Sequence, residues 1–337
     1  MHERYGPIVR VTPDEVSLTS AKAFQKIHTA NSGFTKGPAF DKIKPGPVAS
    51  VFTMRDVNEH AARRKILLRA FTLTSLRRNW AHRIRNQVEI AISNIKLEAE
   101  NDFADIYHWW RLMAADTMAD LAFGQSFGML ATGQRTEYSI ALQNISGNLM
   151  LQRALPLLSR FSWLPLSYIQ AAVQATRIIY DQGNAAVESL KSRSERQSIF
   201  SEILADAETQ KNGSLSDDAI RTEVAVMQIA GSDSIAVTLT YAVWAVLKHP
   251  VTQERLEAEL KGLKPEFCLE DVEFLPVLNN VINETLRLYS PAASTTKRLV
   301  PPTGAAFEGY YLPKGSYVVN LPWLTYRLGD IFPDPDT

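Results

Sequence analysis

The chain has little of the residue types that carry most recognisable chemistry. It has 337 residues and one cysteine, Cys268, which excludes an internal disulfide framework and is typical of a reducing compartment. Its six histidines are scattered without metal-ligand spacing. The sequence contains no CxxC, HExxH or GxSxG motif and no glycine-rich phosphate loop. These absences argue against a dithiol redox protein, a zinc protease, a serine hydrolase and a P-loop enzyme.

Excess charge, targeting signals and repeats are missing as well. The 36 basic and 36 acidic residues give a formal net charge of zero, which argues against a nucleic-acid partner. The first residues have neither the apolar core of a signal peptide nor that of a membrane anchor. No internal repeat, low-complexity segment or linker divides the chain. We therefore predict a single domain over residues 1–337.

What the chain does have is a long apolar run. From Val224 to Leu247 the sequence carries a single charge, Asp233. Ser216 is a candidate N-cap before this run, and Pro250 marks the point where a helix must stop. A helix of roughly 32 residues would be about 48 Å long. A helix that is apolar on every side belongs in a core or in a bilayer.

The middle of this predicted helix is interrupted by the sequence Ala230-Gly231-Ser232-Asp233-Ser234. One alternative is a transmembrane helix, in which Asp233 near the bilayer centre would cost about 2.5–3.5 kcal/mol. The other is a core helix with a polar kink, because serine hydroxyls can bond back to i−4 carbonyls. From this stretch alone the core-kink interpretation is favoured.

The remaining pattern predicts a helix-rich protein with small strands at both ends. Strands are expected at 8–11 and 16–18, and a hairpin over 306–319 with turns at Gly309 and Lys314-Gly315. Helical periodicity continues between them. The predicted helices are a short one from Ser20, then 55–71, 76–99, 102–123, 137–151, 167–191, 195–205, 251–261 and 276–289.

Two charged pairs have helical spacing. His60 and Arg64 are four residues apart, which suits either a solvated basic helix or a cationic clamp for carboxylates. Glu284 and Arg287 are three apart, and such a pair is usually a surface pair of a few tenths of a kcal/mol. On these stretches alone the solvated interpretation is favoured for both pairs.

Taken in order, these pieces resemble the cytochrome P-450 family, the haem-thiolate monooxygenases, in a style common among fungal members. The resemblance runs along essentially the whole chain and rests on six stretches in the family's order. They are His60-x-x-x-Arg64, Ala230-Gly231-Ser232-Asp233-Ser234, Glu284-Thr285-Leu286-Arg287, Lys297 to Pro302, Phe307 to Gly315, and Ile331-Phe332-Pro333-Asp334-Pro335.

The resemblance implies a mainly α, P-450-like fold with a long central helix and small β-sheets. It implies haem as cofactor and the insertion of one oxygen atom from O2 into an apolar organic substrate, with secondary metabolism as a context. Asp233 and Ser234 would relay protons, Gly231 would leave room for ligand beside the helix, and Ala230 would belong with it to the cofactor-binding residues. The resemblance also assigns the haem propionates to His60, Arg64 and Arg298, and a structural role to Glu284 and Arg287.

Two departures from the family pattern bear on this reading. The usual threonine of the acid–alcohol pair is replaced by Ser234. The family's axial cysteine lies downstream of the Phe-Pro-Asp-Pro segment, so the axial ligand is expected to be absent from this chain, and Cys268 precedes the Glu-x-x-Arg helix and does not match it. With that end missing, Glu284 and Arg287 are expected to lack one partner.

The sequence is accordingly expected to be an incomplete domain, truncated at both ends, without an N-terminal anchor and without the haem-cysteine loop. As given, it is predicted not to bind haem productively. Electrons for the full protein would come from NADPH through a reductase, and its location would be intracellular, at the endoplasmic reticulum membrane. The alternative is a catalytically inactive, truncated paralogue or a helical scaffold or binding protein without haem.

Overall fold

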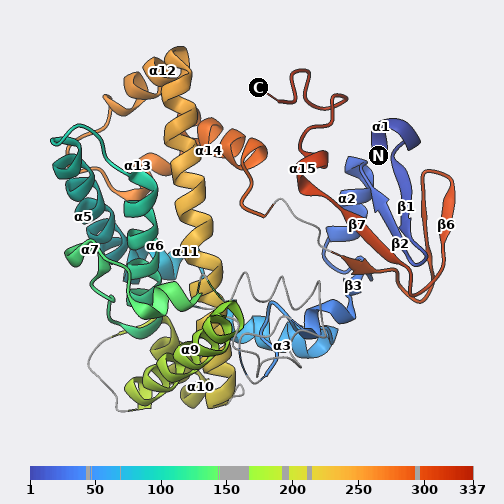
Figure 1. Cartoon of the computed structure of the whole chain (residues 1–337), viewed down its shortest axis with the longest axis horizontal. Coiled ribbons are helices and arrows are strands. Elements are labelled where there is room, and N and C mark those ends of the chain that lie inside the picture. The colour runs from blue at the N-terminus through green and yellow to red at the C-terminus, as the bar shows by residue number, and fades with distance from the viewer. Residues whose placement is uncertain are drawn as a thin grey trace. The chain divides into compact units, whose positions relative to one another are not determined.

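The computed structural model describes residues 1–42, 46, 48–68, 70–142, 144, 167–191, 197–210, 215–292 and 297–336. The described chain forms two compact units (Figure 1). Unit 1 contains Met1–Pro38 and Tyr241–Thr337, and unit 2 contains Ala39–Thr240. No linker separates the units at 240–241, because one long helix continues through this point.

Unit 1 is built on a five-stranded sheet with the strand order β1-β2-β7-β4-β3. β2 and β7 pair in parallel, with Val16 opposite Val318, and the other pairs are antiparallel. The sheet thus joins residues from the two ends of the chain. The strands are β1 Ile8–Thr12, β2 Glu15–Leu18, β3 Thr35–Lys36, β4 Arg298–Leu299 and β7 Tyr317–Asn320.

Helix α2, Ala21–His28, packs its apolar side on this sheet. Ser20 caps it, because its side chain accepts a hydrogen bond from the Ala23 amide. Ala23 and Ile27 then meet Val16 and Val318 in one core cluster. A separate antiparallel pair joins β5 Ala305–Phe307 to β6 Tyr310–Leu312. The other helices of unit 1 are α1 His2–Tyr5, α12 Pro250–Leu260, α13 Leu269–Glu273, α14 Pro276–Leu288 and α15 Pro322–Thr325.

Unit 2 is helical in its described residues. α5 Ala81–Ala99 and α6 Ile106–Phe123 pack together (Figure 1). Asp105 starts α6 by accepting a hydrogen bond from the His108 amide, and Gly124, with a φ of 74°, ends it. The other elements are η1 Pro38–Lys42, α3 Val57–Leu68, α4 Leu73–Ser75, a π-helical turn at Leu76–Trp80, α7 Met129–Thr132, α9 Ser167–Lys191 and α10 Ile199–Gln210.

α11 runs without interruption from Asp217 to Lys248 (Figure 1). Ala219, Ile220 and Val224 pack into the largest core cluster of unit 2, together with Trp80 and Phe200. By length and composition alone this helix is apolar enough to cross a membrane. Its N-terminal half, however, is packed as a core helix of a globular unit.

Most predicted elements are confirmed within the residues that the structure describes. The predicted helix 167–191 and the long central helix have the expected bounds. The predicted hairpin over 306–319 is correct only in its first turn. The segment after Gly315 forms β7, which pairs with β2 and β4 rather than with β6. Most of the predicted helix 137–151 lies outside the described residues.

Candidate functional site

The predicted acid–alcohol pair lies in the middle of α11. Ser234 donates its hydroxyl proton to the Ala230 carbonyl, and Ser232 does the same to the Gln228 carbonyl at 2.8 Å. Thr238 and Thr240 repeat this i−4 bond further along the helix. Each hydroxyl therefore donates its hydrogen bond within α11. A substrate or water molecule that accepts a hydrogen bond from Ser234 must displace the Ala230 carbonyl.

Asp233 is not the buried acid that an all-apolar helix would enclose. Its side chain is 46% exposed, and its Oδ1 lies 3.2 Å from Nε of Arg111 on α6. Arg135 is a third charge nearby. Burial and the charge of Arg111 lower the pKa of Arg135, while the charge of Asp233 opposes that shift. The carboxylate is therefore well accommodated, because α6 supplies a cation and solvent reaches it.

Gly231 serves helix packing. A Cβ at this position would lie 2.6 Å from the sulfur of Met118, so the α6 methionine occupies the space beside the glycine. The prediction that Gly231 leaves room there for a ligand is wrong for this side of the helix, since a side chain already fills it. The neighbouring Ala230 is exposed.

The predicted propionate pair His60 and Arg64 lies on α3. His60 is half-buried, whereas Arg64 is exposed and has no hydrogen bond or ion pair to any residue that the structure describes. The adjacent Arg63 turns the other way. Its Nη1 donates to Oε1 of the buried Glu223 at 3.0 Å, and the same oxygen accepts from the Val51 amide at 2.8 Å. Arg63 thus anchors α3 to α11, while Arg64 faces solvent.

A small cavity lies between the central part of α11 and α6. It has a volume of about 20 Å³ and combines apolar side chains with an ion pair, two serines and a glutamine. Its walls are Arg111, Ala115, Ser139, Leu142, Gln228, Ile229, Ser232 and Asp233.

In unit 1, Glu284 and Arg287 of α14 form a bidentate pair. Nε and Nη2 of Arg287 donate to the two carboxylate oxygens of Glu284 at 2.8 and 2.6 Å. Nη1 donates to the carbonyls of Tyr326 and Pro335 at 2.9 and 2.7 Å. The expectation that this pair lacks a partner is wrong for Arg287, because main-chain carbonyls take up its remaining donors. The pair therefore ties α14 to the segment after α15.

Arg298 begins β4 and is half-buried. Its Nη1 donates to the Lys297 carbonyl at 3.1 Å, and burial lowers its pKa. His28, at the end of α2, lies close enough to be affected by it, since burial and then the charge of Arg298 lower the pKa of His28. A desolvated guanidinium on a sheet is suited to binding a carboxylate.

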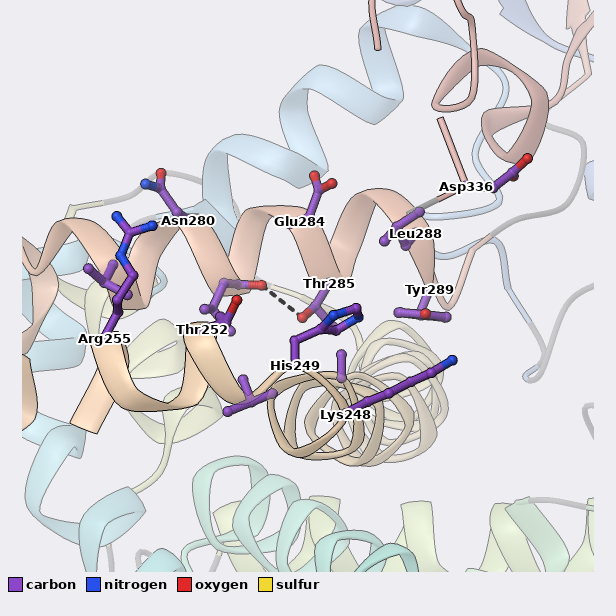
Figure 2. A pocket seen from close by; sticks show the side chains of 14 residues that line it. Lys248, His249, Thr252, Arg255, Asn280, Glu284, Thr285, Leu288, Tyr289 and Asp336 are labelled. Atoms are coloured by element: carbon purple, nitrogen blue, oxygen red, sulfur yellow. Dashed lines mark hydrogen bonds between the residues drawn. The ribbon is translucent and has the colours of Figure 1, made fainter. Parts of the chain in front are cut away.

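A second cavity lies in unit 1. It has a volume of about 430 Å³ and lies between α14, α12 and the end of α11 (Figure 2). Thr285 lines it and donates to the Val281 carbonyl at 2.8 Å, while Tyr289 at its end stacks on Tyr241 with ring centroids 4.6 Å apart. Glu284 is also among the lining residues (Figure 2). The lining thus combines apolar side chains with charged ones, among them Lys248 and Arg255.

The predicted site residues divide between the two units. His60, Arg64 and the motif from Ala230 to Ser234 belong to unit 2, and Glu284, Arg287 and Arg298 belong to unit 1.

A family model described as Cytochrome P450 matches residues 1–337. The chain belongs to the cytochrome P450 family. Among curated relatives, the cytochrome P450 monooxygenase stcB of Emericella nidulans is 34% identical over 100% of this chain and 66% of its own length. The cytochrome P450 monooxygenase aflV of Aspergillus parasiticus is also 34% identical, over 100% of this chain and 68% of its own. This P450 chain thus spans about two thirds of the length of these relatives.

Solved structures agree with the fold of this P450 chain. A retinoic acid-bound cyanobacterial CYP120A1 superposes with a TM-score of 0.79 at 20% identity, over 100% of this chain and 74% of the other. A cytochrome P450DA haem domain gives a TM-score of 0.81 at 16% identity, over 96% and 70%. At these identities the similarity shows the fold alone, which is the helix-rich, small-sheet fold predicted from the sequence.

The P450 family implies haem, and the described residues fit one part of that group. Arg64 and Arg298 are cations suited to the propionate carboxylates. Cys268 does not fit the axial position. It is exposed at the start of α13, its thiol donates to Asp271 at 3.2 Å, and this hydrogen bond raises its pKa, whereas a thiolate ligand needs a lowered one.

Sequence reasoning missed Arg111 and the Arg63–Glu223 pair. A signal for Arg111 was present: it is the only Lys or Arg in the predicted helix 102–123, as Asp233 is the only charge from Val224 to Leu247. Two isolated and opposite charges on neighbouring apolar helices are expected to pair. Arg63 and Arg64 are adjacent, and only the one that faces α11 can pair with Glu223. The sequence pattern does not show which of the two this is.

Proposed function

We propose that the protein acts as a haem-dependent monooxygenase that inserts one oxygen atom from O2 into an apolar organic substrate. The observation that carries the proposal is the family match over the whole chain, together with relatives that are named monooxygenases. We also propose NADPH as the electron source, through a reductase partner, and a secondary-metabolite substrate. The non-enzymatic alternative has no observation in its favour.

In this proposal, haem supplies the site for oxygen activation, and the residues of this chain bind it and manage protons. Arg64 and Arg298, with His60, hold the propionates as charge-assisted donors. Asp233 exchanges protons with solvent, because its carboxylate is partly exposed and held by Arg111. Ser234 passes a proton onward by giving up its bond to the Ala230 carbonyl. Glu284 and Arg287 act structurally, through the contacts described above.

The binding part of the proposal is tested with the chain 1–337, by titrating haem and following the quenching of tryptophan fluorescence. We expect Arg64→Met and Arg298→Met each to weaken binding by about tenfold, as for the loss of a charge-assisted hydrogen bond of roughly 1.5 kcal/mol. Haem dimethyl ester, which lacks the carboxylates, should bind wild type and both variants equally. Equal binding of haem itself by all three proteins would contradict the propionate assignment. Arg255→Met, an exposed arginine of α12, is the matched control.

The axial position has its own test. Because Cys268 is exposed and its thiol pKa is raised, the ferrous carbon monoxide spectrum of residues 1–337 with haem should lack the thiolate-type Soret band. The appearance of that band, and its loss in Cys268→Ser, would show that Cys268 is the ligand after all.

A further inference from the structure

Gln228 is the most anomalous polar side chain on α11. It is 0% exposed, and neither Nε2 nor Oε1 has a hydrogen-bond partner among the described residues. A buried polar group left without a partner destabilises the folded state. Native folds rarely leave both ends of an amide in this state, so a partner outside the polypeptide is expected.

The α6–α11 cavity borders this glutamine and has room for such a partner. Its volume of about 20 Å³ exceeds the roughly 10–15 Å³ that one water molecule needs. Ser139, Ser232 and the Arg111–Asp233 pair also border it. The Ser232 hydroxyl already donates to the Gln228 carbonyl, so its oxygen remains able to accept. A bound water needs two to four polar partners, and the cavity provides that number.

The side chains that line the α6–α11 cavity favour water over an ion or an apolar molecule. A cation would meet the guanidinium of Arg111, and an anion would meet the carboxylate of Asp233. An apolar molecule would leave the Gln228 amide unpaired and would not fit the volume. A small neutral molecule that both donates and accepts satisfies the amide at either end.

We propose that this cavity binds one internal water molecule, which is hydrogen-bonded to the side-chain amide of Gln228 and joins it to the Arg111–Asp233 pair. Gln228 is then a positioning residue, because it fixes the water that contacts Asp233 from the protein interior. The water site itself does not require haem. Only its relevance to proton delivery rests on the proposed function.

The first test uses nuclear magnetic resonance on the isotopically labelled chain 1–337. The Gln228 side-chain NH2 group, assigned from its own backbone resonances, should show a cross-relaxation signal to water with the sign of a long-lived, protein-bound molecule. The side chain of Gln25, exposed on α2, is the matched control and should show only fast bulk exchange. Absence of the long-lived signal at Gln228 overturns the proposal.

The second test is the sign of a stability change. Gln228→Met keeps nearly the same volume and removes both hydrogen-bonding atoms. If water is bound, the variant removes its hydrogen-bond partner. The Tm of the variant then falls by about 2–4 °C, corresponding to roughly 1 kcal/mol. If the cavity is dry, the variant removes an unpaired amide and its Tm rises, which overturns the proposal. Neither readout depends on haem, so failure of the proposed function leaves these results interpretable.

Discussion

The guanidinium of Arg111 and the carboxylate of Asp233 lie 3.2 Å apart and connect the centres of two apolar helices, α6 and α11. Asp233 is partly exposed, so solvent screens the pair, and its contribution to stability is expected to be small. Its more important effect is to hold one rotamer of the acid that the proposed function uses for proton exchange.

The small size of this coupling is the first prediction. A double-mutant cycle with Arg111→Met and Asp233→Asn should give a coupling free energy of about 0.2–1 kcal/mol in urea unfolding. The pair Arg177–Asp181 on α9, which is 3.8 Å apart and more exposed, is the control and should give a value near zero. A coupling above about 3 kcal/mol, as for a buried pair, would show that solvent does not reach Asp233.

The second prediction concerns Gly231 and Met118. Gly231→Ala should destabilise unit 2 by up to about 2 kcal/mol, because an overpacking cost of about 1–3 kcal/mol is offset by a gain in helix propensity of about 1 kcal/mol. In a Met118→Ala background the same change should be neutral or stabilising, since the obstructing sulfur is gone. Thermal unfolding of the four proteins measures this. An identical effect in both backgrounds would mean that Met118 is not the residue that requires the glycine.

Arg287 gives the third prediction. Arg287→Ala removes the donors to Glu284, Tyr326 and Pro335, and hydrogen bonds from a charged group contribute about 1.5–3 kcal/mol each. Even with the Glu284 contribution discounted for solvent, we expect a loss of about 3 kcal/mol or more. Arg287→Lys should recover only part of this stability, because one ammonium group cannot replace the several N–H donors of the planar guanidinium.

The site of proteolytic cleavage distinguishes a local loss of attachment at 326–336 from general destabilisation. In limited proteolysis of Arg287→Lys, cleavage within 326–336 should precede cleavage elsewhere, because that segment loses its attachment to α14. Arg255→Ala on α12 is the control and should be cleaved like wild type. Uniform cleavage across the chain would argue against the attachment.

The fourth prediction is a pH dependence. Burial and Arg298 lower the pKa of His28 below its ordinary value of 6.5, so the unfolded state binds its proton more readily than the folded state. His28 therefore lowers stability as the pH falls through 6.5 towards its folded-state pKa, and has no effect above 6.5. The difference in Tm between wild type and His28→Gln should change between pH 7.5 and pH 5. A constant difference would show that His28 has an ordinary pKa.

Local signals accounted for the parts of the fold that were predicted correctly. Ser20 and Ser216 mark the starts of α2 and α11 because their side chains accept hydrogen bonds from amides three residues on. The pairing partner of the strand after Gly315, β7, was not predictable from such local signals. Its partner, β2, lies about 300 residues earlier, and turn chemistry says nothing about such pairing.

The candidate site was predictable in its residues and less so in their surroundings. Asp233 was singled out as the one charge in an apolar run, but its exposure and its pairing with Arg111 depend on how α6 packs. Gln228 was not singled out, since a buried and unpaired amide can be recognised only once its neighbours are in place.

The parallel pairing of β2 with β7 has a consequence for biosynthesis. The side-chain amide of Asn320 donates to the Leu18 carbonyl across 302 residues of sequence, while all of unit 2 lies between them in the chain. At a ribosomal rate of roughly 5–20 residues per second, β2 is synthesised roughly 15–60 s before its partner β7. Unit 2 is synthesised without a break and is complete before β7 leaves the ribosome. During that interval the backbone amides and carbonyls of β2 that later pair with β7 are exposed. An exposed strand edge can pair with another chain, so a chaperone that covers β2 would protect this chain from aggregation.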